Sequence, residues 1–254
     1  MEVDKKFNNI SIFNLSESWV NVEFDDPSSR NALSENMINE LNNFLDQIKG
    51  NNKIRGISFK GSNGMFCSGA NLKEINKIFQ ASDPKVKAHD ISTSIGKLLK
   101  RIQSLPQVTI MIVEGAVMAG GLGIMCAGDI SIVHSKAKFS LTETKIGLTP
   151  AQISPYVIKK AGFANAKKLM ITAERFTGVE AKEYNLADYL FNSMEELNDI
   201  EKKLKKKILD LAFERIDQDF IDYASKNFVD QIVDGEGREG ILSFVEKREP
   251  NWKK

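Results

Sequence analysis

Residues 118–123 read Met-Ala-Gly-Gly-Leu-Gly, and they follow a strand-like run at 108–113 and a turn at 114–116. Apolar, helix-compatible residues continue from 124 to 127. Glycines in such a turn let backbone N–H groups approach a ligand closely, and the start of a helix presents the positive end of its dipole there. The segment therefore predicts a strand–turn–helix unit that can bind an oxyanion.

A second loop of small residues covers 66–73, Phe-Cys-Ser-Gly-Ala-Asn-Leu-Lys, after a strand-like run at 54–59. The glycines at 120–123 have neither the G-x-x-x-x-G-K-[ST] nor the G-x-G-x-x-G spacing of the common phosphate motifs. One such loop alone is also explained as a tight turn that packs a helix on a sheet. Two loops, each closing a strand and opening a helix, suggest paired donors around one developing negative charge.

The composition excludes several classes of protein. The 254 residues carry a formal net charge of +1, and acidic and basic side chains are interspersed, which argues against a nucleic-acid partner. Cys67 and Cys126 are too few for a disulfide framework and fit reduced, buried thiols. The two histidines, His89 and His134, lie far apart, so no metal site is expected.

No targeting or membrane segment is recognisable. Residues 1–6 carry no apolar leader, and no run approaches the roughly 18 apolar residues that a membrane helix needs. We therefore expect a soluble, cytoplasmic protein.

Strand and helix patterns alternate up to about residue 190, which favours an α/β fold with partly parallel strands. The expected strands are 10–15, 19–24, 54–59, 108–113 and 130–133, with helices at 34–48 and 90–102. Charged amphipathic helices follow at 195–211, 213–223 and 240–247. We expect a core domain at 1–193 and a helical region at 194–254 whose apolar stripes pack within or between subunits.

One carboxylate follows these loops, at Glu143. It lies between the apolar residues Phe139, Leu141 and Ile146. It is either a surface glutamate balanced by Lys145 or a partly buried general acid/base facing the two loops. Spacing alone leaves both interpretations open.

These segments together resemble the enoyl-CoA hydratase/isomerase (crotonase) superfamily over nearly the whole chain. The segments that carry the resemblance are 30–34 (Arg-Asn-Ala-Leu-Ser), 66–75, 113–129, 139–151 and 239–248. The resemblance implies a crotonase-like spiral of ββα repeats with a helical C-terminal oligomerisation region, assembled as a homotrimer or a hexamer (a dimer of trimers). It implies an acyl-CoA thioester substrate and no separate cofactor, because coenzyme A is part of the substrate. It implies no metal, and we expect no nucleic acid or membrane partner.

The resemblance also assigns residues. Ala70 and Gly120 match the two backbone donors of an oxyanion hole, each of which lowers the barrier to an enolate by about 3–4 kcal/mol. The matching substrate and coenzyme A contacts are Ala32, Asn71, Leu72 and Lys73. The Lys73 side chain is either a phosphate or adenine-side contact or a solvated lysine at a helix start.

The chain departs from the family pattern at Gly123. The best-known hydratases carry one catalytic glutamate at this position and a second at the position of Glu143, so here one carboxylate is missing. Glu143 could then hydrate alone, because one carboxylate can take a proton from water and deliver it to carbon. It could instead shuttle a proton as a Δ3–Δ2 enoyl-CoA isomerase, or the chain could only bind CoA thioesters or perform another enolate reaction.

Residues 148–156 help to choose among these functions. The run Pro-Ala-Gln-Ile-Ser-Pro-Tyr resembles the branch that acts on glutaconyl-type thioesters, including methylglutaconyl-CoA and isohexenylglutaconyl-CoA hydratases, which tolerates a glycine at position 123. We therefore expect a hydratase acting on a branched or carboxylated α,β-unsaturated acyl-CoA. Gln152 or Ser154 holds water or a substrate carboxylate, or alternatively serves in helix capping and packing.

Overall fold

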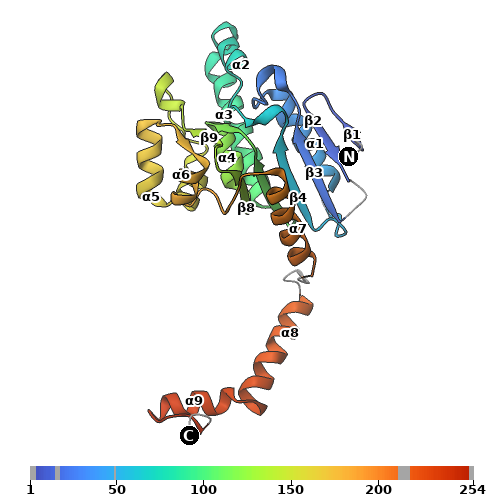
Figure 1. Ribbon diagram of the computed structural model, residues 1–254, viewed down its shortest axis with the longest axis vertical. Coiled ribbons are helices and arrows are strands. Elements are labelled where there is room, and N and C mark those ends of the chain that lie inside the picture. Colours follow the sequence, from blue (N-terminus) through green and yellow to red (C-terminus); the bar gives the residue numbers. More distant parts are fainter. Residues whose placement is uncertain (1–3, 15–17, 49, 211–217, 252–254) are drawn as a thin grey trace. The chain divides into compact units, whose positions relative to one another are not determined.

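The computed structural model describes residues 4–14, 18–48, 50–210 and 218–251. The chain forms two compact units, Met1–Leu209 and Asp210–Lys254. The residues that the sequence assigns to the site all lie in the first unit, whose two sheets and surrounding helices are shown in Figure 1.

A seven-stranded sheet is the larger of the two. Its strands, in spatial order, are β1 (Lys5–Lys6), β2 (Ile10–Phe13), β3 (Trp19–Phe24), β4 (Gly56–Gly61), β6 (Val108–Val113), β8 (Ile130–His134) and β11 (Tyr189–Phe191). The first three pair antiparallel and the strands from β3 to β11 pair in parallel. The predicted pairing of the first two long strands and the predicted parallel strands are thus confirmed, while the predicted turn at 16–18 lies largely outside the described residues.

A four-stranded sheet packs beside it. Its order is β10 (Phe176–Thr177), β9 (Lys138–Ser140), β7 (Ala116–Met118) and β5 (Met65–Cys67). The strands β5, β7 and β9 are parallel, and β10 is antiparallel to β9. Each of the three parallel strands follows a strand of the large sheet after a short turn, so the chain passes three times from the large sheet to the small one.

A helical segment follows each of these strand pairs. The first is α2 (Leu72–Asn76), the 3₁₀ turn η3 (Lys77–Gln80) and α3 (Pro84–Gln103); the second is α4 (Gly120–Ala127); the third is the 3₁₀ turn η4 (Glu143–Ile146) and α5 (Ser154–Thr172). The repeated strand–strand–helix order confirms the predicted α/β class with ββα repeats. In Figure 1 α2 and the start of α3 extend beyond the sheets, whereas the C-terminal half of α3 carries the buried residues Leu98, Leu99 and Ile102.

Local capping explains where two helices begin. The helix α1 (Glu35–Ile48) starts where predicted, because the Ser34 hydroxyl accepts a hydrogen bond from the Met37 N–H at 3.1 Å. The helix α3 begins earlier than the predicted 90–102, because the Asp83 carboxylate accepts bonds from the first-turn N–H groups and Pro84 fits the first helical position.

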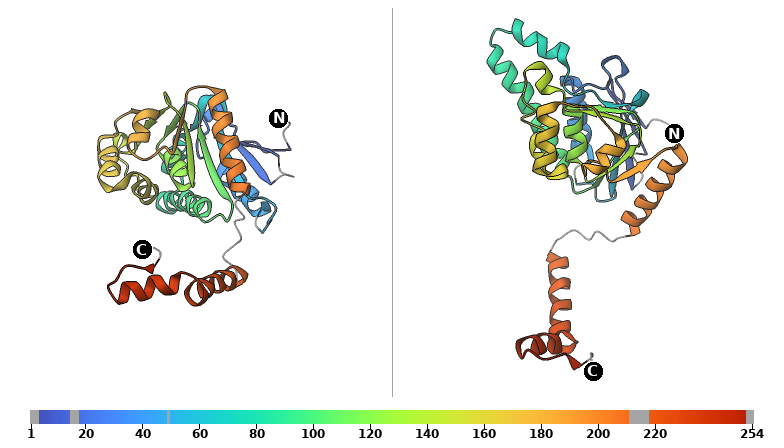
Figure 2. Two further views of the ribbon diagram at one scale, coloured as in Figure 1. Left: turned by 60° about the horizontal axis from the view of Figure 1, so that its bottom comes forward. Right: turned by 60° about the vertical axis from the view of Figure 1, so that its left-hand side comes forward.

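The two faces of the large sheet are covered by different helices. One face contributes to the main core, together with α1, α3 and α4. Alternate residues of the same strands, among them Ile110, Ile112 and Ile132, face α7 (Met194–Asp210) and pack with its Leu197 and Ile208. Figure 2 shows α7 lying along the strands. The first compact unit therefore includes α7, whereas the expected division was at 193/194.

The second unit consists of α8 (Gln218–Val229), a π-helical turn (Asp230–Asp234) and α9 (Gly237–Val245). The predicted helix at 213–223 lies partly outside the described residues, and α9 covers much of the predicted helix at 240–247. The role of this helical unit in oligomerisation stays a prediction. Among the described residues, no helix is long and apolar enough to cross a membrane.

The packing of α7 gives a stability prediction. Leu197→Ala leaves a cavity against the strands and should lower the free energy of unfolding by about 2–5 kcal/mol, as measured by urea denaturation. Leu209→Ala, at the exposed end of the same helix, is the matched control and should cost under about 1 kcal/mol. Equal costs at the two positions would show that α7 does not pack on the sheet.

Candidate active site

Three neighbouring strands of the small sheet end at the same edge. β5, β7 and β9 are parallel, with β7 in the middle, so their carboxyl ends point the same way. The chain leaves β5 through Ala70, β7 through Gly120 and β9 through Glu143. Ligands of open α/β sheets bind outside the carboxyl ends of parallel strands, so this edge is where a site is expected.

The loop after β5 is fixed by backbone hydrogen bonds to Leu33. The Leu33 N–H donates to the Gly69 carbonyl at 2.8 Å, and the Asn71 N–H donates to the Leu33 carbonyl at 3.3 Å. This bridge uses the groups on both sides of Ala70 and leaves the Ala70 N–H without an acceptor in the described structure. The loop therefore presents one oriented, unused donor.

The loop after β7 presents a second donor. Gly120 is the first residue of α4, so its N–H has no acceptor within the helix. The preceding residue, Ala119, has φ 47° and ψ −124°, a conformation that costs an L residue about 1–3 kcal/mol. The Ala119 N–H donates to the Ser140 carbonyl of β9 at 2.9 Å, and this bond holds the strained turn in place.

The two donors are next to one another because Gly69 permits a close approach. Gly69 has φ +95°, and a Cβ there would lie 2.8 Å from the Ala119 Cβ and 3.2 Å from the Gly120 nitrogen. A Cβ on Gly120 would lie 3.6 Å from the Ala70 nitrogen. Two adjacent, unpaired N–H groups are the arrangement that stabilises an oxyanion.

The donors border a cavity of about 420 Å³ between α2–η3, α3 and the loop around η4. Its walls are mostly aliphatic, and they include Leu72, Ile75, Ile78, Ile91, Ile95 and Leu148. Apolar walls with a few convergent polar groups are typical of a small-molecule site.

Glu143 lines the same cavity and is half-buried. Its Oε2 atom is buried and has no hydrogen-bond partner among the described residues. Burial raises the pKa of the Glu143 carboxyl, against a smaller lowering from its own backbone N–H. Thr144 anchors this turn to α5 through a 3.1 Å bond from its hydroxyl to the Met170 carbonyl. Glu143 therefore has one buried, unpaired carboxyl oxygen on a fixed turn, and it does not pair with Lys145 in a described salt bridge.

Gly123 is buried on the cavity side of α4, and Ile153 occupies the space beside it. A Cβ on Gly123 would lie 2.2 Å from Cγ2 and 2.8 Å from Cβ of Ile153, which itself lines the cavity. A glutamate at this position would need Ile153 to move. An aliphatic side chain thus fills the place next to the position at which the family pattern has a second carboxylate.

The four residues that are expected to contact the substrate differ from one another in their position relative to the cavity. Leu72 lines the cavity, whereas Lys73 is exposed and Ala32 is buried, and neither of these two is among the residues that line it. The Asn71 side chain caps α2 by accepting bonds from the Lys73 and Glu74 N–H groups. Coenzyme A contacts by Ala32, Asn71 and Lys73 stay predictions.

The two polar residues after Pro150 are used within the protein. The Gln152 amide lines the cavity and donates to the Ser92 hydroxyl of α3 at 3.0 Å. The Ser154 hydroxyl donates to the Ala151 carbonyl at 3.0 Å. Both bonds agree with the packing and capping interpretation of these residues.

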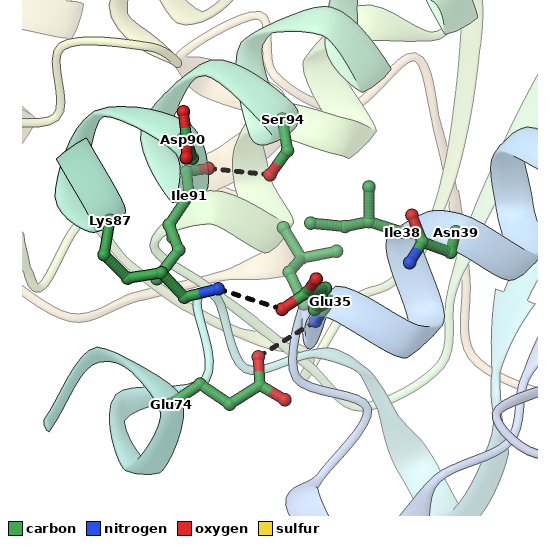
Figure 3. Close-up of a pocket in the computed structure, with 9 residues that line it drawn as sticks. Glu35, Ile38, Asn39, Glu74, Lys87, Asp90, Ile91 and Ser94 are labelled. Atoms are coloured by element: carbon green, nitrogen blue, oxygen red, sulfur yellow. Dashed lines mark hydrogen bonds and ion pairs between the residues drawn. The ribbon is translucent and has the colours of Figure 1, made fainter. Parts of the chain in front are cut away.

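A smaller pocket of about 160 Å³ lies beside the cavity and shares Ile91 with it. Figure 3 shows the Lys87 ammonium and the Glu35 carboxylate pointing at one another, 3.3 Å apart, and the Glu74 carboxylate accepting a bond from the Glu35 N–H at 2.9 Å. These contacts join α1, α2 and α3. The exposed ion pair contributes under about 1 kcal/mol to stability. It matters mainly because it keeps the Lys87 ammonium at the smaller pocket.

Two structural features at this site were not expected from the sequence. Nothing in an alanine at 119 signals a positive φ, because glycine is the residue that favours it. The filling of the space at Gly123 by Ile153 is a contact between segments that only the folded chain brings together.

No group of three or more His, Cys, Asp or Glu side chains in the described part of the chain could hold a metal ion.

The contact between Gly123 and Ile153 predicts a specific mutational coupling. Gly123→Ala should destabilise the protein by about 1–3 kcal/mol through overpacking, measured by urea denaturation. Adding Ile153→Gly to Gly123→Ala should cost clearly less than the sum of the two single changes. Gly120→Ala, on the same helix, meets its nearest side chain at 3.4 Å and is the stability control. Strict additivity would contradict the packing described here.

Comparison with known proteins identifies the family of this chain. The family model for enoyl-CoA hydratase/isomerase matches residues 14–254. The mitochondrial methylglutaconyl-CoA hydratase of Mus musculus is 30% identical over 247 residues, covering 88% of this chain and 76% of that protein. The structure of Pseudomonas aeruginosa AtuE superposes with a TM-score of 0.76 at 30% identity, covering 97% of this chain and 100% of the other. An enoyl-CoA hydratase/isomerase from Marinobacter aquaeolei gives a TM-score of 0.76 at 26% identity, covering 98% and 100%. The chain is an enzyme of the enoyl-CoA hydratase/isomerase family.

Proposed function

We propose that this enzyme adds water across the double bond of an α,β-unsaturated acyl-CoA thioester. The observation that carries the proposal is the unpaired Glu143 carboxyl in the same cavity as the free Ala70 and Gly120 N–H groups. The hydratase names of relatives such as the mouse protein support it.

A single carboxylate can perform both proton transfers. Ionised Glu143 accepts a proton from water while the water oxygen bonds to the β-carbon. The electron pair of the double bond moves toward the thioester, whose oxygen becomes an enolate oxygen. The protonated Glu143 then donates the same proton to the α-carbon, and the enolate collapses to the saturated 3-hydroxyacyl thioester.

The two backbone donors act on the enolate oxygen. Negative charge develops there only during the reaction, so donors fixed at that point lower the barrier, by about 3–4 kcal/mol for each. The bonds of Leu33 and Ser140 hold the two loops before substrate arrives, so the donors need little reorganisation. The raised pKa of Glu143 suits a group that must both accept and return a proton.

The substrate is expected to carry a branched or carboxylated acyl chain, as the resemblance at 148–156 suggests. Methylglutaconyl-CoA, which is named for the mouse relative, has a branched acyl chain that ends in a free carboxylate. We also propose a homotrimer or hexamer assembled through the C-terminal helices. The cytoplasmic location stays a prediction.

The second candidate function is a Δ3–Δ2 enoyl-CoA isomerase. It is favoured because Ile153 fills the space at Gly123, where a second carboxylate would help to bind the attacking water, whereas moving a proton between two carbons uses no such water. The same oxyanion donors would stabilise the dienolate of that reaction.

Heavy-oxygen water separates the two functions. With crotonyl-CoA or 3-methylcrotonyl-CoA, a hydratase forms a 3-hydroxyacyl product that carries the label and loses the conjugated thioester absorbance. Glu143→Gln should lower kcat by about 10²–10⁴-fold and keep thioester affinity within a few-fold. Conversion of a 3-enoyl-CoA into a conjugated, unlabelled product, without hydration of 2-enoyl thioesters, would establish the isomerase instead.

The environment of Glu143 predicts the pH dependence. A raised pKa means that the carboxylate is protonated at a higher pH than an ordinary glutamate, whose pKa is about 4.3. Because the ionised form accepts the proton from water, kcat/KM should fall as the pH drops through the raised pKa. The midpoint of this acid limb should therefore lie above 4.3, and the residual activity of Glu143→Gln should lack it. A midpoint at or below 4.3 would contradict a desolvated base.

A further inference from the structure

The cavity is nearly devoid of charge. Of the described side chains that line it, only Glu143 is ionisable near neutral pH. The polar remainder are uncharged, namely Ser68, Ser92, Thr142, Thr149 and Gln152. No lysine, arginine or histidine is among the lining residues of the described structure.

Cations close by in the sequence or fold lie elsewhere. Lys87 belongs to the neighbouring pocket, where Glu35 pairs with it at 3.3 Å. Lys73 and Lys145 flank lining residues but are themselves exposed and do not line the cavity. A carboxylate inside the cavity would therefore meet no opposite charge among the described lining residues, and Glu143 would repel it.

Aliphatic side chains make up most of the wall of the cavity. Ile153 covers the space beside Gly123, and Ile91 and Ile95 contribute from α3. The Gln152 amide, which could bind a carboxylate, already donates to Ser92. Burying an unpaired carboxylate against such a wall is strongly unfavourable, whereas burying methyl groups is favourable.

We infer that the acyl chain accepted by this site is uncharged and aliphatic, with room for a branch, and that acyl chains ending in a carboxylate are rejected. The inference rests on the proposed thioester chemistry and selects between the two classes of acyl chain left open there.

Three thioesters of nearly the same shape isolate the effect of charge. Glutaconyl-CoA ends in a carboxylate, its primary amide is neutral and polar, and 5-methylhex-2-enoyl-CoA has an isopropyl group in place of the carboxylate. The wild-type enzyme is assayed for kcat/KM with each. Binding of each is measured by calorimetry with Glu143→Gln, in which turnover is suppressed and the cavity keeps its shape.

The kcat/KM of the isopropyl thioester should be about 100-fold or more above that of glutaconyl-CoA. The kcat/KM of the amide thioester should lie in between. The affinities for Glu143→Gln should rank in the same order, with a smaller gap because the repelling charge is gone. The inference would be overturned if glutaconyl-CoA were hydrated or bound to the same extent as the isopropyl thioester. It would also be overturned if the amide and carboxylate thioesters were rejected equally, because that result would indicate selection by shape instead of charge.

The same data separate this inference from the proposed function. If no thioester is hydrated but the affinities still rank isopropyl, amide, carboxylate, then the hydratase proposal fails and the inference stands. If all three are hydrated with the carboxylate preferred, the hydratase proposal stands and the inference fails. Absence of binding by all three would overturn both.

Discussion

The parallel pairing of three short strands, β5, β7 and β9, is the constraint on which the site depends. Each strand is only three residues long, yet each is covalently tied to a longer strand of the large sheet. Parallel pairing places their carboxyl ends at one edge, and the chain then turns away through Ala70, Gly120 and Glu143. Segments that are far apart in the sequence thereby deliver two donors and one carboxyl to the same cavity.

The local cost of this arrangement is offset by the surrounding fold. Ala119 adopts a positive φ, two N–H groups remain unpaired, and a carboxyl oxygen is buried without a partner. Each is unfavourable alone, and each persists because the bridge to Leu33, the bond to Ser140 and the anchored turn at Thr144 fix the backbone. Strain and unsatisfied groups gathered in one place are characteristic of a functional site.

Much of this could be predicted from the sequence, where local signals are strong. The strand at 108–113, the helix start after Ser34 and the glycine turn into α4 follow from apolar runs, capping and glycine placement. The resemblance named Ala70, Leu72, Gly120 and Glu143, which line the cavity, but also Ala32, Asn71 and Lys73, which are not among its lining residues. The division between Leu209 and Asp210, in place of the predicted one after residue 193, could not be inferred, because the apolar stripe of α7 fits a sheet face as well as a subunit interface. Nor could the packing of Ile153 on Gly123 be inferred, since it joins distant segments.

A crystal structure with butyryl-CoA, a saturated thioester that cannot be hydrated, tests the convergence of the three strand ends most directly. The account predicts the thioester oxygen within about 2.7–3.2 Å of both the Ala70 and Gly120 nitrogens. It also predicts the Glu143 carboxyl facing the carbons next to the thioester. A thioester oxygen bound away from these two nitrogens, or a Glu143 carboxyl turned out of the cavity, would contradict it.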